Sequence, residues 1–349
     1  MTATDSLLER FDRSFFNMYA YRAFDEVSTG QHSGFFPTDA IATDVLRGIA
    51  SDQKYIPSKY FYDDTGSRLF EKICELPEYY QTRTELKLLS ENASEIVHGF
   101  MNGNLVELGS GSSIKIRILL EAIGQSRMSG IRYIPVDVCP EALERSSDEL
   151  RLAYPTLTVD PVVADFTKER HYIKADSPRL ITFFGSTIGN LDEEDASSFL
   201  NNLAQKMGPD DRFLVGLDMA KPVHILEAAY NDSQGITARF NRNILLVINR
   251  ELGADFVPEM FEHVACFNED EERIEMHLKA KKDILVRLRK VETSFHIRRG
   301  ETIMTEICRK FRKPSVEEMF GKAGMRVSKW FTDQRGWFSL VEAVSCSSP

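Results

Sequence analysis

The alternation of short apolar runs with amphipathic segments between Leu105 and Met219 limits the possible folds more than any other feature of the sequence. The apolar runs read LVELG, RYIPVDV, LTVDPVVADF, RLITFFGST and RFLVGLDM. Segments with a helical spacing of apolar residues separate most of them, as in IKIRILLEAIG and CPEALERSSDELRLAY. Buried parallel strands joined by helices are typical of βαβ units. The sequence therefore predicts an α/β fold around an open parallel sheet.

The segments on either side of this region have a different pattern. Before it, helical spacing is found in AIATDVLRGIA, SRLFEKICEL and TRTELKLLSENASEIVHGF. After it, the stretch from Lys221 to about Lys282 is predicted to be mostly helical, and the residues from Ile284 to Phe311 alternate in a strand-like order. The C-terminal MRVSKWFTDQRGWFSLVEAV predicts two strands joined by the turn TDQRG. We expect this antiparallel hairpin to close the sheet.

The distribution of charge argues against nucleic acid as a partner. A formal net charge of −10 and a pI near 5.4 do not favour a broad nucleic-acid-binding surface, because such a surface needs clustered Lys and Arg. The basic runs KAKK and RKFRK are short and flanked by apolar residues. We interpret them as the solvated ends of strands or helices.

Other classes of site and location are also disfavoured. The N-terminal region lacks the pattern of a signal peptide, and no run approaches the roughly 18 apolar residues of a membrane span. The five cysteines are scattered, and the seven histidines show no HExxH-like spacing. Neither a disulfide framework nor a metal site is therefore indicated. We expect a cytoplasmic protein with no membrane and no metal partner.

A glycine loop follows the first apolar run, in the sequence ELGSGS that contains Gly109 and Gly111. Glycines at such a turn let the backbone approach a ligand closely and point free N–H groups at it. Alone, the motif is explained as well by a plain βα turn. It is not a Walker loop, because no GK[ST] follows, and it is not the full GxGxxG pattern, because Ile114 stands in place of the third glycine.

Acidic residues near the ends of neighbouring apolar runs make the glycine loop more informative. Glu107 precedes the loop, Asp137 ends the second run, and Asp165 ends the third run together with Phe166. A carboxylate after the second strand can accept hydrogen bonds from both hydroxyls of a ribose. Asp165 can accept from an adenine amine while Phe166 covers the ring. The carboxyl ends of parallel strands share one edge, so the sequence predicts a nucleoside site there.

Longer motifs resemble those of a known family. The stretches KYFYDDTGSRLFEKICELPEYYQTRTE, LVELGSGSSIK, FFGSTIGNL, TARFNRNIL, DEERIEMHLKA and MTEICRKF are similar to those of the histidine-specific methyltransferases of ergothioneine biosynthesis. The resemblance runs from about Pro57 to the C-terminus. It implies a class I S-adenosylmethionine-dependent methyltransferase with a Rossmann-like domain. The implied reaction is threefold methylation of the α-amino group of L-histidine to hercynine.

The resemblance also implies which residues bind S-adenosylmethionine and the amino acid. The residues that would hold the cosubstrate are Gly109, Lys115, Asp137, Asp165 and Phe166. The residues that would hold the carboxylate and amine end of the substrate are Tyr79, Asn190 and Tyr230, with Tyr62 close to the nitrogen that is methylated. The residues that would face the imidazole are Glu306, Cys308 and Met276. We expect Asn190 and Tyr62 to matter most for the methyl transfer.

The resemblance implies a division of the chain into an arm and two domains. Residues 1–36 form an N-terminal arm that the match does not cover, and residues 37–84 plus 221–307 form a substrate-binding domain. Residues 85–220 plus 308–349 form the Rossmann-like domain. We expect the protein to act as a monomer on a small-molecule substrate.

One departure from the family pattern leaves the substrate open. The family has serine where this chain has Cys308, and a thiol is a weaker hydrogen-bonding group than a hydroxyl. Another aromatic amino acid, or a histidine derivative, is therefore an alternative substrate. A non-catalytic binding protein on the same scaffold is disfavoured because the expected ligand residues are present, and an NAD-dependent oxidoreductase is disfavoured by Ile114.

Overall fold

The computed structural model describes residues 38–167 and 176–346. They belong to one compact unit, Phe36–Pro349, and the predicted arm of residues 1–36 lies outside the described part. Within the described ranges, no helix is long and apolar enough to cross a membrane.

The main sheet has eight strands, in the order β12-β13-β6-β5-β1-β2-β3, with β4 also paired to β2. The strands are β1 (Gly103–Leu108), β2 (Ile131–Asp137), β3 (Thr158–Val159), β4 (Val162–Val163), β5 (Arg179–Phe183), β6 (Arg212–Asp218), β12 (Met325–Thr332) and β13 (Phe338–Ser345). Strands β1 to β6 pair in parallel, whereas β13 pairs antiparallel with both β6 and β12. The predicted α/β sheet and its C-terminal hairpin are confirmed, and the parallel sheet with helices on both faces is Rossmann-like.

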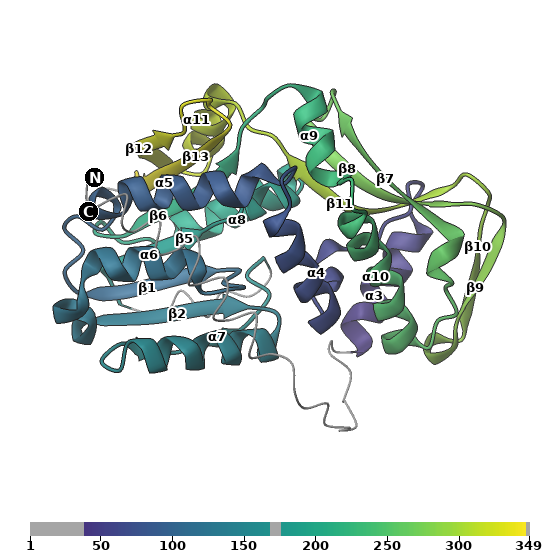
Figure 1. Ribbon diagram of the computed structural model, residues 1–349, viewed down its shortest axis with the longest axis horizontal. Coiled ribbons are helices and arrows are strands. Elements are labelled where there is room, and N and C mark those ends of the chain that lie inside the picture. Colours follow the sequence, from purple (N-terminus) through teal and green to yellow (C-terminus); the bar gives the residue numbers. More distant parts are fainter. Residues whose placement is uncertain (1–37, 168–175, 347–349) are drawn as a thin grey trace. The chain divides into compact units, whose positions relative to one another are not determined.

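Helices cover both faces of this sheet (Figure 1). They are α5 (Tyr80–Ile96), α6 (Ile114–Ile123), α7 (Pro140–Ala153), α8 (Glu193–Ala204) and α11 (Lys313–Lys322), with short 3-10 turns η3 (Gln125–Gly130) and η5 (Thr187–Asn190). Successive strand residues enter different cores, because side chains alternate across a strand. Leu105 packs in the core beneath α5 and α6, while its neighbour Val106 packs in the core beneath α8 and α11.

A second group of elements contains two smaller sheets (Figure 1). Its helices and turns are α3 (Thr38–Ala50), η2 (Ser58–Phe61), α4 (Asp64–Glu75), α9 (Val223–Tyr230), α10 (Ile236–Leu252), η6 (Pro258–Met260) and η7 (Arg289–Val291). Its strands are β7 (Phe261–Asn268), β8 (Arg273–Ala280), β9 (Ile284–Leu288), β10 (Thr293–Ile297) and β11 (Thr302–Arg309). The order β11-β8-β7 is antiparallel, and β9 pairs with β10. Helix α10 packs against α4 and against β7 and β8.

The prediction of a mostly helical stretch from Lys221 to Lys282 was wrong in its second half. The helices end at Leu252, and the residues that follow form β7 and β8. In β8 the residues Ile274, Met276 and Leu278 are all buried, which is the two-residue period of a strand with one face in a core. Overall polarity masked this period in the sequence.

The third apolar run does not form one strand as predicted. It forms the two-residue strands β3 and β4, separated by Asp160 and Pro161. Proline has no N–H to donate to a sheet and so interrupts the pairing with β2. The interruption directs the chain into the segment that carries Asp165 and Phe166.

Candidate functional site

The glycine loop between β1 and α6 forms an open backbone cradle. Gly109 and Gly111 have φ angles of 66° and 46°, in the left-handed region that favours glycine. The Gly109 N–H donates to the Val136 carbonyl at 2.8 Å, and no atom lies within 4 Å of where a Cβ on Gly111 would be. The buried Ser110 hydroxyl has no hydrogen-bond partner among the described residues. An unpaired buried hydroxyl beside open backbone is the kind of site that a polar ligand completes.

Asp137 lies beside this loop as the last residue of β2. One carboxylate oxygen accepts the Gly111 N–H at 3.0 Å, and the other accepts the Cys139 N–H at 3.2 Å. Burial raises the pKa of Asp137, although these N–H groups act in the opposite direction. The neighbouring Glu107 faces inward, where it accepts a hydrogen bond from the Tyr133 hydroxyl, and burial raises its pKa to about 8. Of these two acids, Asp137 is the one held at the loop.

Asp165 and Phe166 lie on the other side of the glycine loop. A Cβ on Gly109 would lie 3.7 Å from the Phe166 ring, so the ring and the loop are neighbours. Phe166 packs edge-on against Phe183, with 5.1 Å between ring centroids. The Asp165 carboxylate accepts the Thr167 N–H at 3.1 Å and pairs with the Lys59 ammonium at 3.4 Å. The structure thus brings Gly109, Asp137, Asp165 and Phe166 to one edge of the main sheet.

Lys115 is held near this edge by a carboxylate that the sequence analysis did not single out. Its ammonium lies 2.7 Å from Glu85, a fully buried residue of α5. The Glu85 carboxylate also accepts the Gly185 N–H, at 2.8 and 3.0 Å to its two oxygens. A Cβ on Gly216 would come within 2.1 Å of the same carboxylate, so β6 needs glycine there. Glu85 ends the motif TRTE, which was the available signal.

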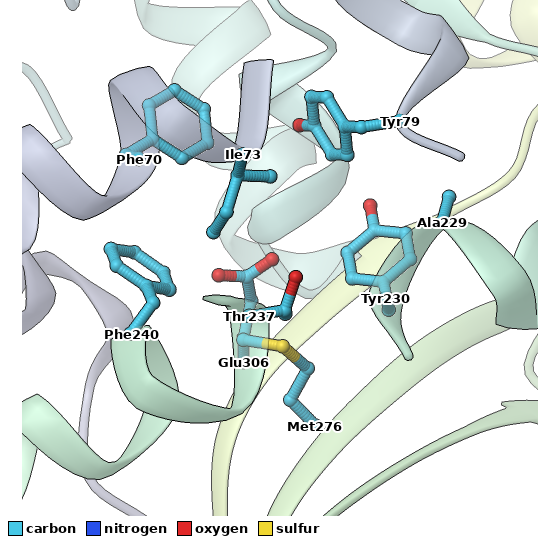
Figure 2. Close-up of a pocket in the computed structure, with 9 residues that line it drawn as sticks. All are labelled: Phe70, Ile73, Tyr79, Ala229, Tyr230, Thr237, Phe240, Met276 and Glu306. Atoms are coloured by element: carbon cyan, nitrogen blue, oxygen red, sulfur yellow. The ribbon is translucent and has the colours of Figure 1, made fainter. Parts of the chain in front are cut away.

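A pocket in the second group of elements gathers several of the predicted substrate residues (Figure 2). Tyr79, Tyr230, Met276 and Glu306 all line it. Met276 and Glu306 face each other across β8 and β11, since they are partners in the strand register. The remaining lining residues, which the sequence analysis missed, are Phe70, Ile73, Ala229, Thr237 and Phe240. The Thr237 hydroxyl is buried without a hydrogen-bond partner among the described residues.

Glu306 supplies a carboxylate to a pocket whose other walls are mostly apolar and aromatic. The register of β11 shifts between Met304 and Glu306, and this irregularity re-aims the side chain. Burial raises the pKa of Glu306 to about 7, with the Lys310 ammonium acting in the opposite direction. Among the described residues, no hydrogen bond or ion pair to this carboxylate is found. An imidazole N–H entering the pocket would satisfy it.

Tyr62 packs against the aromatic wall of the pocket. Its ring packs against Phe70 and Phe240, at centroid distances of 5.7 and 5.9 Å, and both of these rings line the pocket. Burial raises the pKa of the Tyr62 phenol well above its usual range, and the charges of Glu306 and Asp137 raise it further. Tyr62 is therefore a direct neighbour of two aromatic side chains of the pocket.

Asn190 ends η5 and does not line the pocket. Its loop is fixed at several points. Ser186 has a φ of 56°, and its hydroxyl accepts the Asp218 N–H at 2.9 Å. A Cβ on Gly189 would lie only 3.0 Å from the Arg309 carbonyl, so η5 lies directly against the end of β11. Asn190 is half-buried beside this contact.

Behind the pocket lies a buried charged cluster that the sequence analysis missed. Asp218, at the end of β6, is completely buried and pairs with the ammonium groups of Lys310, at 2.8 Å, and Lys221. Burial alone would raise the pKa of Asp218, but the two ammonium groups outweigh it and the pKa lies below its usual value. The interpretation of RKFRK as a solvated strand end was wrong for Lys310, which is 3% exposed. Strand alternation offered a signal, because Glu306, Cys308 and Lys310 share one face.

Comparison with known proteins covers nearly all of the described chain. Residues 41–345 match a family model described as histidine-specific methyltransferase, SAM-dependent. The histidine N-alpha-methyltransferase of Mycolicibacterium smegmatis is 42% identical over 306 residues, which are 88% of this chain and 95% of that protein. The enzyme of the same name from Mycobacterium tuberculosis is 41% identical, over 87% of this chain and 95% of that protein. Ergothioneine biosynthesis protein 1 of Neurospora crassa is 30% identical over 84% of this chain and 35% of its own length.

Proposed function

The chain belongs to the family of histidine-specific, S-adenosylmethionine-dependent methyltransferases, and we propose that it methylates the α-amino group of L-histidine. We infer three successive transfers that give hercynine, as the first step of ergothioneine biosynthesis. The main support is the pocket that Glu306 shares with Tyr79 and Tyr230, with the Tyr62 ring packed against its aromatic wall.

The residues at the edge of the main sheet fit S-adenosylmethionine. The open space beside Gly111, the unpaired Ser110 hydroxyl and the Asp137 carboxylate can accommodate the polar groups of a nucleoside and an amino acid tail. S-adenosylmethionine supplies an electrophilic methyl group on a sulfonium. We propose that Gly109, Lys115 and Asp137 bind its amino acid and ribose parts. We propose that Asp165 and Phe166 bind its adenine.

The residues of the pocket would bind and orient histidine. Glu306 would accept an imidazole N–H, beside Cys308 and Met276. Tyr79, Asn190 and Tyr230 would hold the carboxylate and amine end. An amide such as Asn190 can accept from the amine while it donates to the carboxylate, so it orients the nitrogen lone pair without protonating it.

Aromatic residues suit a product that gains a permanent positive charge. Each methylation removes an N–H donor, so a fixed cage of hydrogen-bond acceptors would lose its partners. The face of Tyr62 can stabilise the developing cation by cation–π attraction whatever the number of methyl groups. We therefore propose Tyr62 as the residue next to the methylated nitrogen.

We propose the domain division expected from the sequence. Residues 37–84 plus 221–307 would form the substrate-binding domain, and residues 85–220 plus 308–349 the methyltransferase domain. The strand pairing supports a division of this kind, since no strand from β7 to β11 pairs with a strand of the main sheet, although the last two residues of β11 lie beyond residue 307. We propose further that the protein is a cytoplasmic monomer that binds no nucleic acid, in line with its acidic composition.

A second candidate is Nα-methylation of another aromatic amino acid or of a histidine derivative. The observation that favours it is Cys308, which is buried against Lys310 and offers a weak group in place of the family serine. Its Sγ lies 3.0 Å from the Lys310 ammonium. One contact to the imidazole would then be lost or weakened.

A panel of amino acids distinguishes these candidates. We expect incubation with S-adenosylmethionine and histidine to give mass gains of one, two and three methyl groups, with little product from phenylalanine or tryptophan. The variant Asp137→Ala tests the proposed cosubstrate site in the same experiment. The loss of charge-assisted ribose bonds, worth about 1.5–3 kcal/mol each, should weaken S-adenosylhomocysteine binding in calorimetry. Preferential methylation of tryptophan or phenylalanine would favour the second candidate, and no methylation of any panel member would contradict both.

A further inference from the structure

We propose that Lys310 is a positioning residue that directs the hydroxyl proton of Tyr230 toward the ligand and thereby selects substrates with a carboxylate. The proposal rests on the histidine methylation proposed above and adds a residue behind the pocket to it. Lys310 does not line the pocket in Figure 2, whereas Tyr230 does.

The Lys310 ammonium is completely buried, and its contacts match its three N–H donors. It lies 2.8 Å from Asp218, 3.0 Å from the Cys308 sulfur and 3.2 Å from the Tyr230 hydroxyl oxygen. Burial would lower the pKa of Lys310, but the Asp218 charge outweighs it and the pKa lies well above its usual value. The ammonium is therefore protonated, and it acts on Tyr230 and Cys308 only as a donor.

A second donor fixes the Tyr230 hydroxyl from another side. The Gln81 amide nitrogen lies 3.2 Å from Asp218 and 3.1 Å from the Tyr230 hydroxyl oxygen. Because a carboxylate such as Asp218 only accepts, the amide nitrogen of Gln81, and not its oxygen, must face it. The nitrogen then donates one N–H to Asp218 and the other to Tyr230. The phenol oxygen thus accepts from Lys310 and from Gln81, and its own proton must be donated elsewhere.

The acceptor that the cluster offers for that proton is weak. Lys310 contacts both the Tyr230 hydroxyl and the Cys308 sulfur, so Cys308 is held near Tyr230, and a thiol sulfur accepts poorly. A carboxylate in the pocket is a much stronger acceptor, and a charge-assisted bond to it is about twice as strong as a neutral one. An incoming carboxylate therefore takes the Tyr230 proton in preference to Cys308.

The charge of the cluster acts in the same direction. One carboxylate, Asp218, faces the ammonium groups of both Lys310 and Lys221, so positive charge exceeds negative charge within it. Burial lowers the pKa of Lys221, so Lys221 holds its proton less tightly than Lys310 does. Lys221 contacts Tyr80, Asp218 and the Met219 carbonyl, and none of these lines the pocket. Of these two lysines, Lys310 is the one whose ammonium contacts a pocket residue, Tyr230.

Histidine and histamine separate the role of Lys310 from general stability, because they share the imidazole and the amine but only histidine has a carboxylate. In Lys310→Met we expect kcat/KM for histidine to fall about 10- to 100-fold, as for one lost charged hydrogen bond. The value for histamine should change less than about threefold, because no carboxylate contact is lost. Where histamine turnover is undetectable, its inhibition constant against histidine replaces kcat/KM. Affinity for S-adenosylhomocysteine should be unchanged.

Three further variants complete the experiment. Lys310→Arg keeps a buried cation and should restore part of the preference for histidine. Lys221→Met removes the other cation from Asp218 and should keep the histidine-to-histamine ratio within about threefold of wild type. Gln81→Leu removes the second donor to Tyr230 and should lower the ratio, which tests the proposal even if Lys310→Met does not fold.

Each result bears on the proposal directly. Equal losses for histidine and histamine in Lys310→Met, or an unchanged ratio in Gln81→Leu, would overturn the positioning role. An equal drop of the ratio in Lys221→Met would also overturn it, because the effect would then act through Asp218 alone. If wild-type protein methylates no histidine, the proposed function fails instead, and the two failures are thus distinct.

Discussion

At the scale of single residues, Glu306 is proposed to bind the substrate, but its burial lowers the stability of the protein without ligand. Burial raises the pKa of its carboxyl from 4.5 to about 7. A carboxyl whose pKa is higher in the folded state binds its proton more tightly there than in the unfolded chain. Its contribution to stability is therefore complete below about pH 4.5 and is lost as the pH rises through about 7.

Replacement of Glu306 by glutamine should expose this cost as a pH dependence. Glutamine cannot ionise, so Glu306→Gln should gain stability over wild type, by roughly 1–3 kcal/mol, between pH 5 and pH 8. The measurement is urea unfolding without ligand at four pH values across this range. Exposed Glu317→Gln controls for the loss of a surface carboxylate. Stability curves that stay parallel for Glu306→Gln and wild type would show that Glu306 ionises normally in the folded state.

Site residues at the ends of apolar runs could be predicted from the sequence, whereas the charged residues behind the pocket could not. Asp137 and Asp165 stand at recognisable strand ends, and the structure brings both to the glycine loop. Asp218 has the same signal, since it ends the run RFLVGLD, but its partner Lys310 is distant in sequence and appeared to belong to a solvated basic run. Only folding brings a charge of the opposite sign to Asp218.

At the scale of elements, η5 owes its position to its tight fit against β11. The close approach at Gly189 leaves no room for a side chain, because a Cβ there would lie 3.0 Å from the Arg309 carbonyl and 3.3 Å from the Arg309 nitrogen. Both are backbone atoms, so relief of the clash requires the two elements to separate. Such a separation would move Asn190, the next residue.

Gly189→Ala should therefore impair methyl transfer without a direct change to any proposed ligand residue. We expect kcat/KM for histidine to fall about 3- to 10-fold, since the backbone must shift by a few tenths of an ångström and a shift near 1 Å can cost about 100-fold, while S-adenosylhomocysteine binding persists. The control is Gly321→Ala in α11, where no atom lies within 4 Å of the new Cβ. It should keep full activity and gain up to about 1 kcal/mol of stability. Full activity in Gly189→Ala would mean that the position of η5 does not limit the reaction.

Strands were predicted correctly from the sequence where both of their faces are buried. They were missed where one face is exposed. The central strands β5 and β6 are buried on both faces and mostly apolar, so their runs stand out. Strands β7 and β8 carry polar residues on their exposed positions, and the helical spacing of the preceding α10 was extended into them. Pro161, in the middle of the third run, was a sequence signal that this run forms two short strands and not one.

At the scale of the whole molecule, the main sheet and the sheet of β9 and β10 should differ in local stability. Strand β13 has a hydrogen-bonded neighbour on each side, β6 and β12, and its residues Leu340 and Val341 lie in different cores. The sheet of β9 and β10 has only two strands. Two-stranded sheets are marginally stable on their own, so local opening there needs much less than global unfolding.

Hydrogen exchange followed by mass spectrometry should show this difference. We expect peptides from β6 and β13 to exchange only through global unfolding, and peptides from β9 and β10 to exchange several orders of magnitude faster. Histidine and S-adenosylhomocysteine together should slow exchange in β8 and β11, which carry Met276 and Glu306, more than in β9 and β10. Equal protection of β9 and β13 would contradict the proposed ranking.

The place of β13 also has a consequence for synthesis of the protein. Strand β6 ends at Asp218, but the neighbour that covers its outer edge begins only at Phe338. On the ribosome, at about 5–20 residues per second, the roughly 120 intervening residues take some 6–24 s to be made. During that time the nascent chain carries the unpaired edge of a hydrophobic strand, the kind of surface to which chaperones and other unfinished chains bind. A translational pause within this interval would therefore lower the yield of folded protein without any change in its sequence.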